Sequence, residues 1–292
     1  MSDPRDSEET PWDPQPGAPS GEPSYALLDA QGDSDAQGDS ANEALETSPR
    51  RPGGWNYWDV LFLLLFAIPA HVLAIAACVG VFLLFGQLSS SEMELGSLIT
   101  HAPLVVAVQF VWWGLMLGFI YGVVSLKYGL PFGPAIGWRG LDRPPTVYLL
   151  WGVLLAVSVA LMSHLLPEST EKMPIEDLFT NRTSLIVLAF FGVLAAPAIE
   201  EVVFRGFLYA AVERSHGALL AVLLTSSVFS LLHASQYGWR WQNLLLLTYV
   251  GLIFGVVRAR TQSVVPSTLL HAGYNATLFA GMFAVGDQIL TG

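Results

Sequence analysis

Charged residues stand inside one of the most apolar stretches of this 292-residue chain. The segment PAIEEVVFRGFL, residues 197–208, places Glu200, Glu201 and Arg205 between SLIVLAFFGVLAA and YAAV. On a helix, Glu201 and Arg205 are four residues apart and share a face, so they are expected to form an ion pair. Glu200 points about 100° away and has no compensating charge on its own helix. We therefore expect Arg205 to neutralise Glu201 and Glu200 to be left for chemistry.

Two later apolar segments also carry polar side chains. His233 lies in FSLLHAS, and His271 precedes Asn275 by one helical turn in LLHAGYNA. Polar groups at membrane depth are costly unless they meet one another or line a wet cavity. The sequence therefore predicts one site built from three helices. Its expected members are Glu200, His233, His271 and Asn275, supported by Glu201 and Arg205.

Such a site has the parts needed for amide hydrolysis. A carboxylate and an imidazole across a cavity can hold a water and take its proton. A second histidine and an amide can donate to the oxygen of an attacked carbonyl. A covalent nucleophile is not indicated, because the single cysteine, Cys78, is distant in sequence and no serine elbow occurs. Ser227 and Ser230 are read as helix-packing residues.

Three motifs resemble those of a known family. EEVVFRG at 200–206, FSLLH at 229–233 and HAGYN at 271–275 match EExxxR, FxxxH and HxxxN of the CAAX-processing and bacteriocin-processing (CPBP, or Abi) intramembrane proteases. The resemblance covers residues 147–284. It implies a polytopic helical bundle that cuts a membrane-embedded or lipid-anchored protein or peptide, with CAAX-type, bacteriocin-like or regulatory substrates left open. It also implies that Glu200 and His233 activate water while His271 and Asn275 form the oxyanion pocket.

The resemblance leaves metal dependence open, since family members have been described both as metalloproteases and as metal-independent glutamate proteases. If a zinc ion were used, Glu200, His233 and His271 would be its ligands, because two histidines and a carboxylate suit catalytic zinc. The sequence lacks the HEXXH helix motif. The histidine and asparagine of the HxxxN motif also suit an oxyanion pocket better than a zinc site. We therefore favour a mechanism without a cofactor.

The elements that must position these residues are apolar helices. A spanning helix needs about 20 apolar residues, and seven segments meet or approach that length. They are residues 58–85, 103–125, 147–166, 184–212, 217–235, 243–258 and 263–284. Trp55, Tyr57 and Trp58 are expected to anchor the first span at the interface. The fold class predicted is all-α, a transmembrane bundle of about seven spans.

Arginines and lysines alternate between the loops in a way that predicts topology. Arg50, Arg51, Lys127, Arg214 and Arg258 fall in loops or at helix ends on one side, whereas the loop after the first span has none. This alternation indicates a multi-pass protein with a cytoplasmic N-terminus. The plasma membrane of a bacterium is the expected location. The segment 130–145 is expected to lie along the interface.

Composition divides the chain into parts. Residues 1–54 hold about half of the 24 acidic residues and a tandem DAQGDS repeat, and are expected to be a disordered acidic tail. The other expected parts are N-terminal membrane helices at 55–145, a catalytic bundle at 146–286 and a short tail at 287–292. The net charge of -11 comes mostly from the tail, so it does not indicate a nucleic-acid partner.

Two other functions fit a polar site in a membrane. A proton-coupled transporter would predict an internal repeat and paired broken helices, and the sequence has neither. A non-catalytic immunity or scaffold protein on the same bundle would be favoured by a missing catalytic residue. All six motif residues are present, so the protease remains the main hypothesis.

Overall fold

The computed structural model describes residues 54–89, 93–167, 173–179 and 181–291. Of these residues 84% are helical, and no strand occurs among them, which confirms the all-α prediction. The expected tail at 1–54 lies outside the described residues except for its last position. The domain divisions at 145 and 286 stay predictions.

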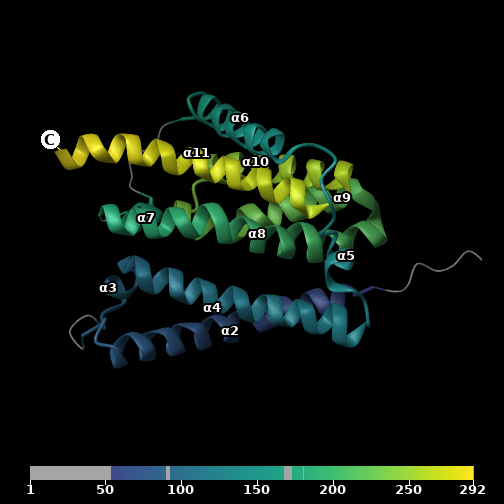
Figure 1. The fold of residues 1–292 in the computed structure, drawn as a ribbon, viewed down its shortest axis with the longest axis horizontal. Helices are drawn as coiled ribbons and strands as arrows, with labels where there is room; N and C mark the ends of the chain where they lie inside the picture. Colours follow the sequence, from purple (N-terminus) through teal and green to yellow (C-terminus); the bar gives the residue numbers. More distant parts are fainter. Residues whose placement is uncertain (1–53, 90–92, 168–172, 180, 292) are drawn as a thin grey trace, which may run out of the picture. The chain divides into compact units, whose positions relative to one another are not determined.

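The first two long helices, α2 (Tyr57–Leu84) and α4 (Ala102–Tyr121), form an antiparallel pair (Figure 1). The short α3 (Leu95–Thr100) precedes α4, which continues as the π-helix η2 (Gly122–Lys127). Asn56 begins α2 with a capping box, in which its side chain accepts from the backbone and Asp59 accepts from its amide at 2.9 Å. Asp59 also pairs with Lys127 and Tyr128, so the start of α2 is tied to the end of η2.

The polypeptide then crosses to a second group of helices. The connecting elements are α5 (Phe132–Ile136), α6 (Pro145–Ser163) and the 3-10 helix η3 (Pro174–Leu178). α6 packs closely along the last helix, α11 (Val264–Thr291) (Figure 1). A Cβ on Gly152 would lie 2.2 Å from the carbonyl oxygen of Leu270, and one on Gly273 would lie 2.4 Å from that of Leu149. Only glycine permits this backbone approach, which fixes the depth at which α11 presents His271.

A nearly continuous helical segment carries the central motif. It consists of α7 (Arg182–Phe190), the π-helix η4 (Phe191–Ala195), α8 (Ala196–Glu201), the π-helix η5 (Val202–Leu208) and α9 (Tyr209–Leu232). Gly217, with φ 80° and ψ 170°, interrupts α9. This conformation is easily reached by glycine, and it breaks the segment where the sequence separates the predicted spans 184–212 and 217–235.

The remaining helices return the chain past this segment. A short 3-10 helix, η6 (Ala234–Tyr237), leads to α10 (Trp241–Thr261), which packs against α9 and ends where α11 begins. Five segments are long and apolar enough to cross a membrane, counting 182–232 as one. The protein is therefore a multi-pass membrane protein, while the count of seven spans is not confirmed.

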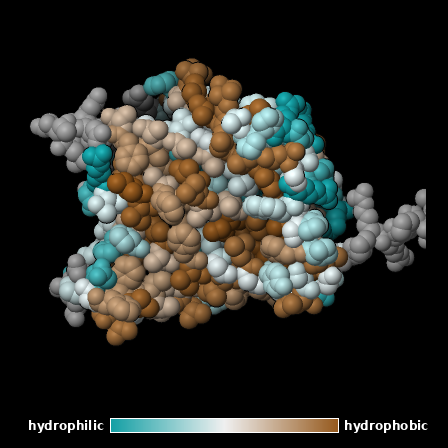
Figure 2. Space-filling model, viewed as in Figure 1, coloured by the Kyte–Doolittle hydropathy of each residue, from teal (hydrophilic) through white to brown (hydrophobic). Residues whose placement is uncertain are grey.

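The surface agrees with a bilayer environment. Large apolar side chains are exposed along the helices, among them Ile68, Leu84, Leu154 and Leu161. In the view of Figure 2, apolar residues cover most of the face and hydrophilic residues gather toward its two ends. A surface of this kind faces lipid in the middle and water at the ends.

Candidate active site

One cavity of about 630 Å³ collects polar side chains from three helical segments. Glu200 lies on α8, His233 directly follows α9, and His271 and Asn275 lie on α11. All four line this cavity. The structure thus brings together the four residues that the sequence motifs were expected to unite.

Two imidazoles face the Glu200 carboxylate without a direct hydrogen bond. Nε2 of His233 lies 4.0 Å from Oε1 of Glu200, and Nε2 of His271 lies 3.8 Å from Oε2. Hydrogen-bonded nitrogen and oxygen atoms are usually about 2.7–3.2 Å apart, so neither ring bonds directly to Glu200. The carboxylate and the two rings face one another across a gap in which a bridging water can be proposed.

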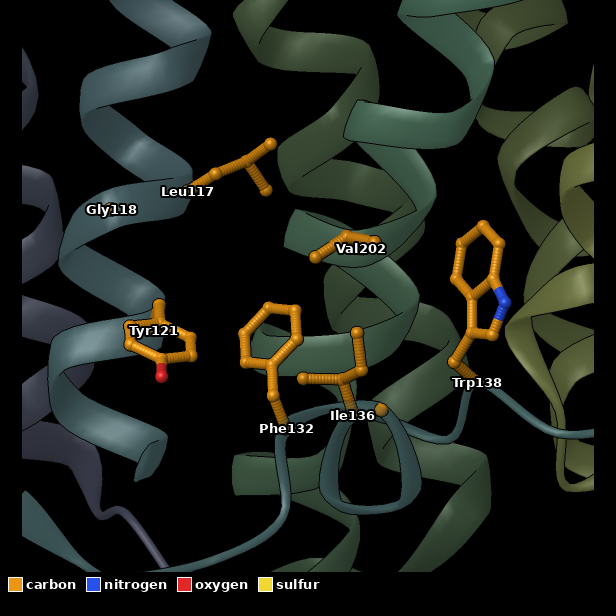
Figure 3. Close-up of a pocket in the computed structure, with 8 residues that line it drawn as sticks. Leu117, Gly118, Tyr121, Phe132, Ile136, Trp138 and Val202 are labelled. Atoms are coloured by element: carbon orange, nitrogen blue, oxygen red, sulfur yellow. The ribbon is translucent and has the colours of Figure 1, made fainter. Parts of the chain in front are cut away.

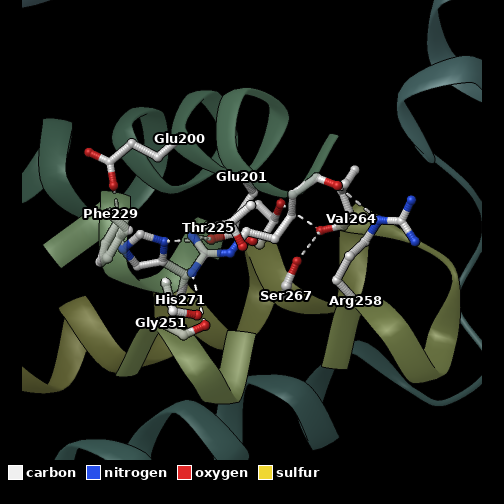
Figure 4. A network of polar contacts seen from close by, with 12 residues as sticks. Glu200, Glu201, Thr225, Phe229, Gly251, Arg258, Val264, Ser267 and His271 are labelled. Carbon is white, nitrogen blue, oxygen red and sulfur yellow. Dashed lines mark hydrogen bonds and ion pairs between the residues drawn. The ribbon is translucent and has the colours of Figure 1, made fainter. Parts of the chain in front are cut away.

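The second nitrogen of each ring determines which atom faces that gap. Nδ1 of His233 lies 2.8 Å from the carbonyl oxygen of Phe229. Because a carbonyl only accepts, Nδ1 carries the hydrogen and the neutral ring presents a lone pair at Nε2. Nδ1 of His271 lies 3.3 Å from Oε1 of Glu201, which orients this ring between the two carboxylates (Figure 4).

Glu201 and Arg205 form the buried ion pair that their spacing predicts. Nη1 of Arg205 lies 3.1 Å from Oε1 of Glu201, and both side chains are fully buried. Nη2 of Arg205 also donates to the carbonyl oxygen of Gly251 on α10 at 3.0 Å. Removing one partner of such a pair leaves an uncompensated charge and costs about 3–5 kcal/mol. Glu201 is thus held by an ion pair on its own helix, whereas Glu200 faces the cavity.

Aromatic rings complete the surroundings of the buried guanidinium. The Arg205 Cζ atom lies 4.9 Å from the ring centre of Phe229, 5.2 Å from that of Phe254 and 5.7 Å from that of Phe204. Ring faces attract a cation, and more strongly when water is excluded. Phe229 is therefore important to the FxxxH motif in two ways, because its carbonyl orients His233 and its ring packs on Arg205.

The helix is distorted at Pro197, just before the acidic pair. The π-helix η4 ends two residues earlier. In π-helical spacing the carbonyl of Gly192 would accept from residue 197, which is a proline and has no amide hydrogen. Instead, Nδ2 of Asn275 donates to the Gly192 oxygen at 2.6 Å. In this structure Asn275 therefore ties α11 to the distorted helix and keeps one amide hydrogen for another acceptor.

The π-helix η5, which carries Arg205, is held by side chains from elsewhere in the chain. Nε of Arg258 donates to the carbonyl oxygen of Arg205 at 3.0 Å, and Nε1 of Trp55 donates to that of Phe207 at 2.8 Å. The Trp55 ring also stacks on the Phe207 ring, with centres 5.1 Å apart and an interplanar angle of 4°. These contacts fix the wide helical turn directly after Glu201.

The sequence does not reveal these two supporting residues. Trp55 directly precedes the first span, but its ring faces protein and not lipid headgroups, since only 2% of its surface is exposed, compared with 67% for Trp58. Arg258 was counted as a topology marker but is buried against Tyr209, with Cζ 4.9 Å from the ring centre. Trp55 and Arg258 lie 152 and 53 residues away in sequence from the residues whose carbonyl oxygens they bind, so the sequence around η5 gives no sign of them.

Tyr237 is a further cavity residue that the motifs do not include. It lies on η6, four residues after His233, and lines the same cavity as Glu200. Burial, and then the charge of Glu200, raise the pKa of Tyr237. Its hydroxyl therefore stays protonated near neutral pH and is available as a donor.

A second hollow, of about 540 Å³, lies between α4, α5 and η5 (Figure 3). Its walls are formed by apolar and aromatic residues. These include Leu117, Tyr121, Phe132, Ile136, Trp138 and Val202. It has no carboxylate, imidazole or amide side chain in its lining, so it does not compete with the larger cavity as the site of hydrolysis.

The polar cluster does not fit a metal ion as it stands. Among the residues that the structure describes, no three or more His, Cys, Asp or Glu side chains form a group that could hold one. The imidazole nitrogens face Glu200 at 3.8 and 4.0 Å, and Glu201 is already paired with Arg205. We therefore derive no step through a metal, and independence from metal remains a prediction.

Comparison with known families gives one match. A family model described as type II CAAX prenyl endopeptidase, Rce1-like, matches residues 182–277. The matched range contains all three motifs, and it confirms the resemblance to the CAAX-processing proteases. No curated protein and no solved structure gives a significant match.

Proposed function

Because residues 182–277 match the Rce1-like family of CAAX prenyl endopeptidases, we propose that this protein is an intramembrane endopeptidase. One observation carries the proposal: Glu200, His233, His271 and Asn275 line a single cavity in a helical bundle, five segments of which are apolar enough to cross a membrane. A transporter or a scaffold does not require a carboxylate, two imidazoles and an amide around one water position. Together these groups can activate a water and stabilise the oxyanion that forms when a peptide bond is attacked.

Hydrolysis begins with a water held between Glu200 and His233. The Glu200 carboxylate takes one proton from this water while the neutral Nε2 of His233 accepts its other hydrogen in a hydrogen bond. The water oxygen forms a bond to the carbonyl carbon of the substrate, whose oxygen takes up the electron pair of the C=O bond. The proton on Glu200 then passes to the leaving nitrogen as the C–N bond breaks. The products are a carboxylic acid and a free amine.

The negative charge on the substrate oxygen needs donors in place before it forms. Nδ1 of His271 faces Glu201 and its Nε2 faces the cavity, on the side of Glu200, so a ring with hydrogens on both nitrogens can donate in both directions. Asn275 has a second amide hydrogen besides the one given to Gly192. These two residues are the proposed oxyanion donors, as the family resemblance implies.

Lipidated proteins are the substrates that the cavity supports best. Its lining combines the polar cluster with apolar side chains that include Ile99, Val105, Leu278 and Met282. A CAAX sequence ends in a prenylated cysteine, two aliphatic residues and one variable residue, so it brings both a peptide bond and apolar groups. The distribution of basic residues supports a cytoplasmic N-terminus for this multi-pass protein.

The test compares protein termini in membranes of cells that carry the wild-type protein or the Glu200→Ala variant at equal abundance. We expect new C-termini of membrane or lipidated proteins in the wild type that are absent from the variant. A matched control is Glu176→Ala, which changes an acidic residue of η3 that is not among those lining the cavity. Identical termini in wild type and Glu200→Ala, across a well-covered membrane proteome, would refute proteolysis.

A further inference from the structure

A peptide in this cavity cannot be held in the manner common to proteins that bind extended peptides. Such proteins often pair the backbone of the peptide with the edge of a sheet. No strand occurs in the part of the chain that the structure describes. Side chains must therefore meet the N–H and C=O groups of a bound substrate, since unpaired peptide groups are costly away from water.

Gln109 is the cavity residue best suited to that task. It lies in α4, whose other side chains include no amide and no charged group, and it lines the cavity together with Glu200 and His271. α4 belongs to a segment apolar enough to cross the membrane. A polar side chain in such a segment is costly unless it meets a polar partner or a wet cavity.

The Gln109 amide is also unoccupied. It makes no hydrogen bond to any residue within the described ranges, whereas Asn275, in the same cavity, is bonded to Gly192. A glutamine side chain has one acceptor oxygen and two donor hydrogens on a single plane. This group can pair with both the N–H and the C=O of one peptide unit.

We propose that Gln109 is a substrate-binding residue whose side-chain amide hydrogen-bonds to a backbone peptide group of the bound substrate. This inference rests on the proposed function, because it assumes a peptide ligand. It adds α4 to the substrate site, although α4 lies outside the matched residues 182–277. Gln109 then holds the peptide in register while Glu200 and the histidines act on the scissile bond.

The test uses the full-length protein in liposomes and a fluorescent, farnesylated peptide with a CAAX end. Gln109→Met keeps the length of the side chain and removes its hydrogen bonds. We expect kcat/KM to fall about tenfold, as for one or two lost hydrogen bonds, mainly through a higher KM. Val106→Ala, which alters the shape of the same cavity wall, is the matched control. It should leave the hydrogen bonds between Gln109 and the substrate intact.

Peptide substrates in which a single ester replaces one backbone amide show which peptide group Gln109 contacts. The ester lacks the N–H, so at the position that Gln109 binds, Gln109→Met should cause little further loss. At the other positions the full loss should remain. Equal kcat/KM for wild type and Gln109→Met, or the same loss with every ester peptide, would overturn the inference.

Binding to proteins that also carry Glu200→Gln separates this inference from the proposed function. If the wild type does not cleave the peptide but Gln109→Met weakens its binding, proteolysis is refuted and the role of Gln109 stands. If the wild type cleaves and Gln109→Met binds and cleaves equally well, only the inference about Gln109 fails. If the peptide is neither cleaved nor bound by the wild type, both are refuted for this substrate class.

Discussion

Nδ2 of Asn275 donates a 2.6 Å hydrogen bond to the carbonyl oxygen of Gly192, five residues before Pro197. The proline lacks the amide that would serve this oxygen in π-helical spacing. The asparagine of the third motif thus compensates for a distortion that lies just before the first motif. Asn275 therefore has a positioning role in addition to its proposed role as an oxyanion donor.

This relationship predicts coupling between Asn275 and Pro197. Asn275→Ala should lower the free energy of unfolding by about 1 kcal/mol through the lost hydrogen bond. In a Pro197→Ala background the helix regains an amide donor, so Asn275→Ala should cost less stability there. Thermal unfolding of the four proteins in one detergent measures the difference. Equal costs in both backgrounds would show that the proline does not create the need for the asparagine.

The two adjacent glutamates should respond differently to substitution. Glu200→Gln should give normal yield and lose activity by about 10²–10⁴-fold, since it removes a general base. Glu201→Gln leaves Arg205 buried without a counter-charge and should lower stability by about 3–5 kcal/mol. Yield and melting temperature of the purified variants, with peptide cleavage measured on the folded fraction, check this. Equal yields with equal loss of activity would contradict the division of roles.

Trp55 should support the active site from the start of the first described helix. Trp55→Phe keeps stacking on Phe207 but removes the donor to its carbonyl, so we expect stability to fall by about 1 kcal/mol and kcat to decrease. Trp58→Phe, at an exposed position, serves as the control. If both variants behave as the wild type does, Trp55 does not hold η5.

Chelation should leave activity unchanged. The described residues provide no group of side chains that could hold a metal ion, and the proposed steps use only Glu200, the two histidines and Asn275. Cleavage of the farnesylated peptide is measured after dialysis against EDTA and against 1,10-phenanthroline. Loss of cleavage that returns on addition of Zn²⁺ would show that Glu200, His233 and His271 act as ligands instead.

The sequence predicts that these polar side chains lie together, because their positions follow local rules. Spacing by four places Arg205 beside Glu201, and the cost of polar groups in apolar helices predicts that Glu200, His233 and His271 meet. These arguments need only helical periodicity and the properties of the membrane.

Other features depend on contacts between distant segments and could not be predicted. The π-helix η5 has no local signal, and the partners of its carbonyl groups, Trp55 and Arg258, are identified only by tertiary packing. A tryptophan near a span suits an interface as well as a core, so the sequence could not separate Trp55 from Trp58. The same holds for Gln109, whose direction on α4 decides whether it meets lipid, protein or the cavity.

The most direct test of the account is the coupling between Glu200 and His233, whose facing atoms are 4.0 Å apart. If both hold the same attacking water, removing either one removes its activation, so the losses should not multiply. We measure kcat for peptide cleavage by Glu200→Ala, His233→Ala and the double variant. We predict that the double variant retains about the activity of the weaker single variant. Losses that multiply would show that the two residues act independently and would contradict a shared water.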